Sequence, residues 1–166
     1  MKKLLLAIAL LSVFGILHAQ SPLPVGKSQI NVGLGLSDGG IPIYLGLDYS
    51  VHKDITIGGE FSFRSYNENW KDNSYHHNVI GISGNGNYHF NTLLQIPQNF
   101  DFYAGLNLGF YFWSSPFDYD GDHNNGLGLG AQIGGRYYFS DRVGINLEFG
   151  GGNEFLGGKF GLSIKL

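Results

Sequence analysis

Residues 102–113 have the sequence FYAGLNLGFYFW, in which every second residue from Phe102 to Phe112 is apolar. The residues between them are tyrosine, glycine, asparagine and tryptophan. Successive side chains of a strand point to opposite faces, so this alternation predicts a β-strand with one apolar and one mostly polar face. The stretch is also long enough to cross a bilayer as a tilted strand, which takes about 9–11 residues.

The same period of two recurs along the rest of the chain. Together with the stretch above it predicts eight strands, at residues 30–36, 41–51, 55–64, 80–90, 102–113, 127–139, 143–149 and 160–166. No segment after residue 27 keeps a helical period over several turns. An even number of antiparallel strands brings both ends of a sheet to the same side. We therefore expect an all-β fold, an eight-stranded antiparallel up-and-down barrel.

The first residues have the organisation of a secretory signal peptide. Two lysines precede an apolar stretch at residues 4–17, and Ala19 supplies a small residue for cleavage. The apolar stretch is too short to span a bilayer as a helix, which takes about 20 residues. We expect residues 1–19 to be removed on export, residues 20–28 to form a periplasmic N-terminal segment, and residues 29–166 to form the barrel.

The composition excludes several classes of protein. Charged residues make up 14% of the chain, against about 25% in soluble domains, while the chain holds 27 glycines, 13 phenylalanines and 10 tyrosines. There is no cysteine, which excludes disulfides, thiolate metal sites and a lipid-modified N-terminal cysteine. The formal net charge of -3 becomes more negative when the signal peptide is removed, and gives no reason to expect nucleic-acid binding.

Alternation alone leaves two barrels open: one with its apolar face towards lipid, and a soluble lipocalin-like one with that face inside. The polar face favours the first, because it consists mainly of Gly, Ser, Asn and Tyr and carries too few charges for a solvated surface. Aromatic residues near the strand ends favour it too, since transmembrane barrels have two aromatic girdles. The expected inner girdle holds Tyr49, Tyr88, Phe90, Phe102, Tyr137 and Phe139, and the outer one Phe61, Phe63, Phe110, Phe112 and Phe149.

The charges of the polar face predict how the lumen is filled. Eight strands leave an interior just wide enough for side chains, and buried charges in so narrow a space require partners. We expect a plugged lumen with an ion-pair network that comprises Asp48, Glu60, Arg64, Arg136, Glu148, Lys159 and Lys165.

The last strand adds a resemblance to a known family. Residues 159–166, KFGLSIKL, alternate to the end of the chain, as do residues 102–110. Both resemble strands of the OmpA/OmpX-like small outer-membrane β-barrel family, although that family usually ends in Phe and this chain ends in Leu166. The resemblance implies a place in the cell outer membrane, contact with its lipid and lipopolysaccharide, and recognition of the C-terminal strand by the barrel-assembly machinery.

The connections predict the orientation of the barrel. Short turns are expected at residues 51–54 and 140–142, whereas residues 65–78, 114–125 and 150–158 are longer and rich in Gly, Asp or Asn. Outer-membrane barrels place short turns on the periplasmic side and long loops outside. Two connections depart from this rule, a short outer one at residues 37–40 and a long inner one at residues 91–98. Four aromatic residues of the outer loops are candidates for surface contacts: Trp70, Tyr75, Phe117 and Tyr119.

Two groups of loop residues suggest metal sites without meeting their requirements. Residues 118–124 resemble the start of a calcium-binding EF-hand loop, but His123 and Leu129 stand where that loop requires glycine and glutamate. A hydrated acidic loop is the preferred interpretation, and calcium binding at residues 118–122 stays open. His76 and His77 could share a zinc ion with His123 only if two loops brought them together. We expect no metal and no cofactor.

An enzyme is also disfavoured. Small barrels that modify lipid A resemble this chain in length, and their deacylase family carries a His-x-Ser pair on the lipid-facing surface. The chain has no such pair, since His89 is followed by Phe90 and Asn91. The sequence therefore predicts a structural or adhesion-type outer-membrane protein that acts through its outer loops. A narrow porin-like channel for small solutes is the alternative, and a lipid A-modifying enzyme is the least favoured of the three.

Overall fold

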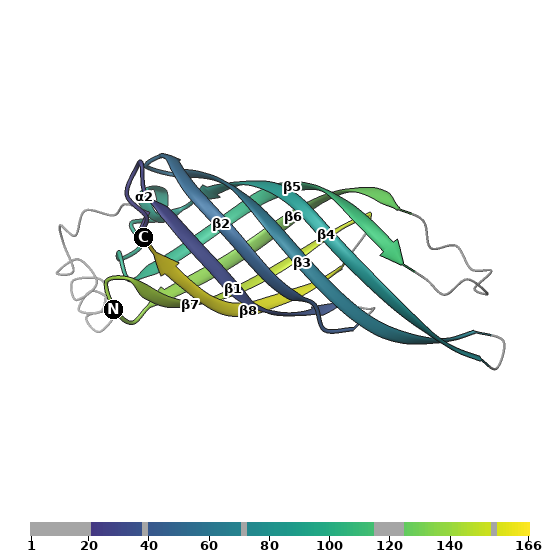
Figure 1. Ribbon diagram of the computed structural model, residues 1–166. Coiled ribbons are helices and arrows are strands. Elements are labelled where there is room, and N and C mark those ends of the chain that lie inside the picture. The colour runs from purple at the N-terminus through teal and green to yellow at the C-terminus, as the bar shows by residue number, and fades with distance from the viewer. Residues whose placement is uncertain (1–20, 38–39, 71–72, 115–124, 154–155) are drawn as a thin grey trace, which may run out of the picture.

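The computed structural model describes residues 21–37, 40–70, 73–114, 125–153 and 156–166. Its strands are β1 (Ser28–Ser37), β2 (Ile43–His52), β3 (Ile55–Trp70), β4 (Asn73–His89), β5 (Phe100–Ser114), β6 (Gly126–Tyr138), β7 (Val143–Gly152) and β8 (Leu156–Lys165). Each strand pairs antiparallel with its neighbour in sequence, and β8 closes the barrel onto β1. The predicted eight-stranded up-and-down barrel is confirmed (Figure 1).

The direction of the two faces decides between the barrels that the sequence left open. Apolar side chains of every strand are exposed on the outside, as Leu106 and Leu129 are at 66% and 62%. The alternating residues point inward and are buried, among them Tyr103, Gln29 and Ser163. A lipocalin-like interior is thereby excluded. The outward apolar face and the closed ladder, which leaves no sheet edge within the barrel wall, are what a lipid-embedded sheet requires.

The two ends of the barrel differ. One end, called the turn end here, carries the connections from His52 to Ile55 and from Tyr138 to Val143, together with the chain's C-terminus. It also carries helix α2 (Asn91–Leu94) within the long inner connection that the sequence predicted. Among the described residues no helix has the length and apolar character to cross a membrane. The opposite end is called the loop end.

Strands β3 and β4 correct the prediction of a loop at residues 65–78. Their ladder continues to the pair of Trp70 and Asn73. Strand β2 accompanies β3 only as far as Phe63, and β5 accompanies β4 only from Asn78. The hairpin therefore runs past the barrel wall as a two-stranded ribbon at the loop end (Figure 1). The prediction was wrong because this part lies beyond the apolar zone, so its sequence lacks the alternation that revealed the other strands.

The connection predicted at residues 150–158 is also shorter than expected. Strand β7 continues to Gly152 and β8 begins at Leu156. The prediction missed these strand ends because both are rich in glycine, which has no side chain and contributes nothing to a hydrophobic pattern.

At the turn end, the N-terminal segment before β1 contacts the barrel. Gly26 adopts a positive φ of 81° and donates its N–H to the Ser50 carbonyl at 2.9 Å, and Leu23 is buried.

Candidate functional site

The lumen holds most of the polar side chains of the barrel, and its lower part is organised around Arg136. The Arg136 guanidinium donates Nη2 to Asp48 Oδ2 at 2.8 Å and Nη1 to Asp101 Oδ2 at 2.9 Å. It also lies 4.2 Å from the centroid of the Tyr103 ring. All four side chains are buried. We call this group the Arg136 cluster, and it closes the lumen near the turn end.

A second set of contacts extends the Arg136 cluster. His89 Nδ1 lies 2.7 Å from Asp101 Oδ1, and His89 Nε2 lies 3.0 Å from Thr56 Oγ1. Sequence reasoning missed Asp101, because the fifth strand was taken to begin at Phe102. The apolar side chain of Phe100, which continues the outward alternation, was the sign that Asp101 points into the lumen.

The middle of the lumen is organised around Lys159. Its Nζ donates to Glu60 Oε2 at 2.8 Å and to Glu148 Oε1 at 2.7 Å. The Tyr103 hydroxyl donates to the second oxygen of Glu148 at 2.8 Å. The ammonium also lies 5.3 Å from the centroid of the Tyr44 ring. We call this group the Lys159 cluster; one cation is shared between two carboxylates.

Amide and hydroxyl side chains join the barrel wall to both clusters. Asn31 Nδ2 donates to Asp48 at 2.8 Å, and Asn31 Oδ1 accepts from Gln29 at 2.9 Å and from Ser163 at 2.7 Å. Asn146 donates to Ser163 at 3.0 Å and accepts from the Tyr44 hydroxyl at 2.7 Å. Apart from Arg136 Nε, which has no partner among the described residues, the lower lumen is thus filled by side chains that satisfy one another, which is the condition for burying polar groups at low cost.

Two residues of the expected network have other partners. Arg64 Nη1 donates to Ser37 Oγ at 3.0 Å, and its guanidinium lies 5.1 Å from the centroid of the Trp113 ring. Lys165 Nζ lies 3.8 Å from the centroid of the Tyr138 ring at the turn end. Within the described side chains neither cation forms an ion pair. Of the seven predicted residues, the structure brings together five, as Asp48 with Arg136 and as Glu60 and Glu148 with Lys159.

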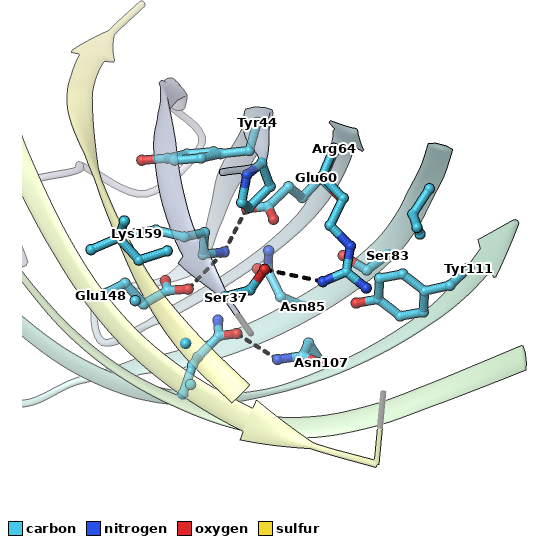
Figure 2. A pocket seen from close by; sticks show the side chains of 18 residues that line it. Ser37, Tyr44, Glu60, Arg64, Ser83, Asn85, Asn107, Tyr111, Glu148 and Lys159 are labelled. Atoms are coloured by element: carbon cyan, nitrogen blue, oxygen red, sulfur yellow. Dashed lines mark hydrogen bonds and ion pairs between the residues drawn. The ribbon is translucent and has the colours of Figure 1, made fainter. Parts of the chain in front are cut away.

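A cavity opens above the Lys159 cluster, towards the loop end (Figure 2). It has about 780 Å³ of space, including the part open to solvent, and we call it the outer vestibule. Its floor is the Lys159 cluster, and glycines of β7 and β8 make room in its wall. Its polar lining consists of Ser37, Tyr44, Glu60, Ser62, Arg64, Ser83, Asn85, Asn107, Tyr111, Gln132, Glu148 and Lys159. A smaller space of about 340 Å³ lies between the two clusters.

The other candidate residues are placed only in part. Trp70 and Tyr75 lie in the ribbon of β3 and β4, and their side chains lie outside the described part of the structure. Phe117, Tyr119 and residues 118–124, including the EF-hand-like segment and His123, lie outside the described residues. His77, which the sequence placed in the loop at residues 65–78, is instead a fully buried residue of β4. Among described residues there is no group of His, Asp and Glu that could hold a metal ion.

The outward apolar face, the closed ladder and the side-chain-filled lumen define the class of the protein: it is a small transmembrane β-barrel. No protein-family model matches the chain, and no curated protein matches it in sequence. The comparison with solved structures gives matches of low identity that cover nearly the whole partner chain.

Three of these solved structures illustrate the likeness. The outer membrane protein OprG from Pseudomonas aeruginosa has a TM-score of 0.66 at 10% identity, with 87% of this chain and 97% of that chain covered. Neisserial surface protein A has a TM-score of 0.58 at 14% identity, with 84% and 95% covered. A de novo designed transmembrane β-barrel has a TM-score of 0.56 at 17% identity, with 86% and 98% covered. The resemblance to small outer-membrane barrels is confirmed at the level of the fold.

Proposed function

We propose that this protein is an outer-membrane barrel that acts by surface interaction through the β3–β4 ribbon, while its lumen is closed to solutes. The observation that carries the proposal is the contrast between the β3–β4 ribbon and the lumen. The ribbon projects beyond the wall at the loop end, and the lumen below it is crossed by two ion-pair clusters. Signal peptide 1–19 would deliver the chain to the periplasm for insertion.

The ribbon suits an interaction role because of its backbone. Among the described residues, no barrel strand pairs with its outer edges beyond Phe63 on β3 and before Asn78 on β4. Strand edges are templates for an added strand, with main-chain hydrogen bonds giving affinity and alternate side chains giving specificity. The aromatic candidates Trp70 and Tyr75 lie at the far end of this ribbon, where aromatic side chains commonly anchor protein contacts.

Location and partners follow from the fold by analogy. The apolar wall requires lipid, and two of the structural neighbours are named as an outer membrane protein and a surface protein. We propose contact with outer-membrane lipid and lipopolysaccharide through this wall. We also propose recognition of β8 by the barrel-assembly machinery during insertion.

A narrow channel for small solutes is the second candidate. It is favoured by the outer vestibule, which reaches from the loop end down to the Lys159 cluster. Conduction would require a wet path past both clusters. Planar-bilayer recordings separate the two candidates, because a closed lumen predicts no steady conductance whereas a channel predicts steady open levels.

A non-enzymatic role is part of the proposal. One set of contacts resembles a catalytic triad, in which a base contacts a nucleophile and an orienting acid. His89 takes the place of the base, between the Thr56 hydroxyl and the Asp101 carboxylate. All three are buried, and Asp101 is shared with Arg136. A substrate would have to enter the filled lower lumen, so we assign these contacts to holding the lumen closed. A mass shift of lipid A on expression of the protein would contradict this assignment.

The orientation of the barrel can be tested cleanly because the chain has no cysteine. Asn67→Cys in the ribbon should be labelled by a membrane-impermeant maleimide on intact cells. Leu93→Cys on α2, which is also exposed, should be labelled only after the outer membrane is permeabilised. The reverse pattern would show that the ribbon faces the periplasm and would end the surface-interaction proposal.

The interaction role itself requires a comparison of the intact and the shortened ribbon. A variant in which residues 68–75 are replaced by a two-residue Asn-Gly turn, joining the paired residues Asn67 and His76, keeps the barrel wall, so its heat-modifiable gel migration should be unchanged. Cells that express it should attach less to one another and to immobilised matrix proteins than cells with the intact ribbon. Equal attachment in every assay would contradict the role.

A further inference from the structure

The outer vestibule contains a buried acceptor that no described residue satisfies. Asn107 is 7% exposed, lines the vestibule, and its Oδ1 has no hydrogen-bond partner among the described residues. Leaving a buried acceptor without a donor costs about 1–3 kcal/mol. Such a group in a native cavity calls for an explanation, and an incoming donor is one.

Asn107 is one end of a chain of side-chain amides. Its Nδ2 donates to Gln132 Oε1 at 2.8 Å, and Gln132 Nε2 donates to Asn87 Oδ1 at 2.7 Å. Asn87 Nδ2 then donates to Asn85 Oδ1 at 3.3 Å. All the amides thus donate in one direction, from β5 through β6 to β4. Asn107, at the start of this chain, lines the same cavity as Asn85 and Gln132.

The charges of the vestibule indicate what kind of molecule would fit. Its charged side chains are Glu60, Glu148, Lys159 and Arg64, two of each sign. Both carboxylates are held by Lys159, and Arg64 donates to Ser37 beside the Trp113 ring (Figure 2). An entering cation would lose water without gaining a free carboxylate, and an entering anion would meet only Arg64, which is already held by Ser37 and the Trp113 ring. A neutral molecule meets no such cost.

We propose that the outer vestibule binds a neutral, hydroxyl-rich solute of about the size of one sugar unit. Hydroxyl groups both donate and accept, so one can donate to Asn107 Oδ1 while others meet the amides and serines of the lining. The Tyr44 and Tyr111 side chains supply less polar wall. The vestibule is open at its mouth, so one sugar unit would lie partly inside it and partly in solvent. The solute could be a free monosaccharide or the end of a glycan.

The test is amide NMR of the full barrel in phospholipid nanodiscs, titrated with D-glucose, D-galactose, N-acetyl-D-glucosamine and maltotriose. We expect saturable shifts in the millimolar range for amides that line the vestibule, such as those of Asn107, Gln132 and Gly150. Amides of the Arg136 cluster, below the floor, should not move. Tighter binding of maltotriose than of glucose would identify a glycan end as the preferred source, and the opposite order a free sugar.

Two variants and a matched control make the test specific. Asn107→Leu removes both the open acceptor and the donor to Gln132, and Ser62→Leu fills the vestibule from another strand without touching the amide chain. Each should weaken sugar binding about tenfold or more, the worth of a hydrogen bond or of lost space. Asn99→Leu, at an exposed site of the turn end, should leave binding unchanged. Heat-modifiable migration checks that each barrel is folded.

Several results would overturn the proposal. No saturable shift with any of the four sugars would remove the site. Equal or stronger shifts with glycine or sodium acetate would show that charge is recognised, contrary to the argument from charge balance. Unchanged binding in both the Asn107→Leu and the Ser62→Leu variant would place the sugar elsewhere. Because none of these readouts involves the ribbon, their failure is distinguishable from failure of the surface-interaction role.

Discussion

Replacement of Arg136 by methionine tests whether the lower lumen is a stabilising ion cluster. The guanidinium is paired with Asp48 at 2.8 Å and with Asp101 at 2.9 Å, and these side chains are at most 4% exposed. Removing one partner of a buried pair costs about 3–5 kcal/mol, because an uncompensated charge remains. Asp48 keeps the Asn31 amide and Asp101 keeps the His89 ring as donors, so we expect the lower part of that range, about 3 kcal/mol.

The two carboxylates are not equally affected by this substitution. Asp101 can form an ion pair with a protonated His89, whereas the described partners of Asp48 then include only a neutral amide, that of Asn31. The double variant Arg136→Met with Asp48→Asn should therefore recover more stability than Arg136→Met with Asp101→Asn. Unfolding by urea from lipid vesicles, followed by gel migration and tryptophan fluorescence, measures both. Arg64→Met, which removes a cation outside both clusters, is the control and should cost about 1 kcal/mol or less.

The reasoning would be refuted by either of two results. A loss below about 1 kcal/mol for Arg136→Met would mean that the cluster contributes no more than a surface ion pair. Equal rescue by the two asparagine variants would mean that His89 does not compensate Asp101.

Three further predictions concern conduction, lipid contact and packing. The double variant Arg136→Met with Lys159→Met should show steady, cation-selective conductance in planar bilayers, because four carboxylates then line the lumen without a central cation. If the double variant shows no conductance, the two clusters are not what closes the lumen. Leu106→Arg on the outward face should cost about 2–4 kcal/mol in vesicle unfolding if that residue lies near the bilayer midplane, and no loss would contradict lipid contact. Gly134→Ala should destabilise the barrel, since the added methyl would meet the Tyr103 ring, whereas Gly86→Ala on the outside meets nothing within 4 Å and should be neutral in the same assay.

The fold and the direction of its faces were predictable because both follow from a period of two. Each apolar residue of the quoted stretch, such as Leu108, is on the outside, and each residue between, such as Tyr103, is inside. This inference needs only local sequence, since adjacent side chains of a strand must face opposite ways. Strand ends were less predictable. Beyond the bilayer the outward face need not be apolar, so residues 65–70 and 73–78 gave no pattern.

The lumen contacts were only partly predictable, for a different reason. Which residues face inward follows from alternation, but which of them meet depends on the stagger of strands far apart in the chain. Lys159 joins Glu60 across the barrel, and Arg136 joins Asp48 in the same way. No periodicity encodes that register. Asp101 was missed because the predicted start of the fifth strand was two residues late, which shows how much a polar network depends on exact strand limits.

The two clusters differ in how firmly they close the lumen, and this bears on the channel alternative. In the Lys159 cluster the side chains of Lys159 and Glu60 are 22% and 17% exposed, and one cation serves two carboxylates. Solvent from the outer vestibule reaches this cluster, so its ion pairs are weaker and easier to rearrange. In the Arg136 cluster the guanidinium is buried between two carboxylates and an aromatic ring. Rearrangement of the Lys159 cluster alone would join the vestibule to the space below it without opening a path through the barrel. The Arg136 cluster is therefore the barrier that a channel mechanism must explain.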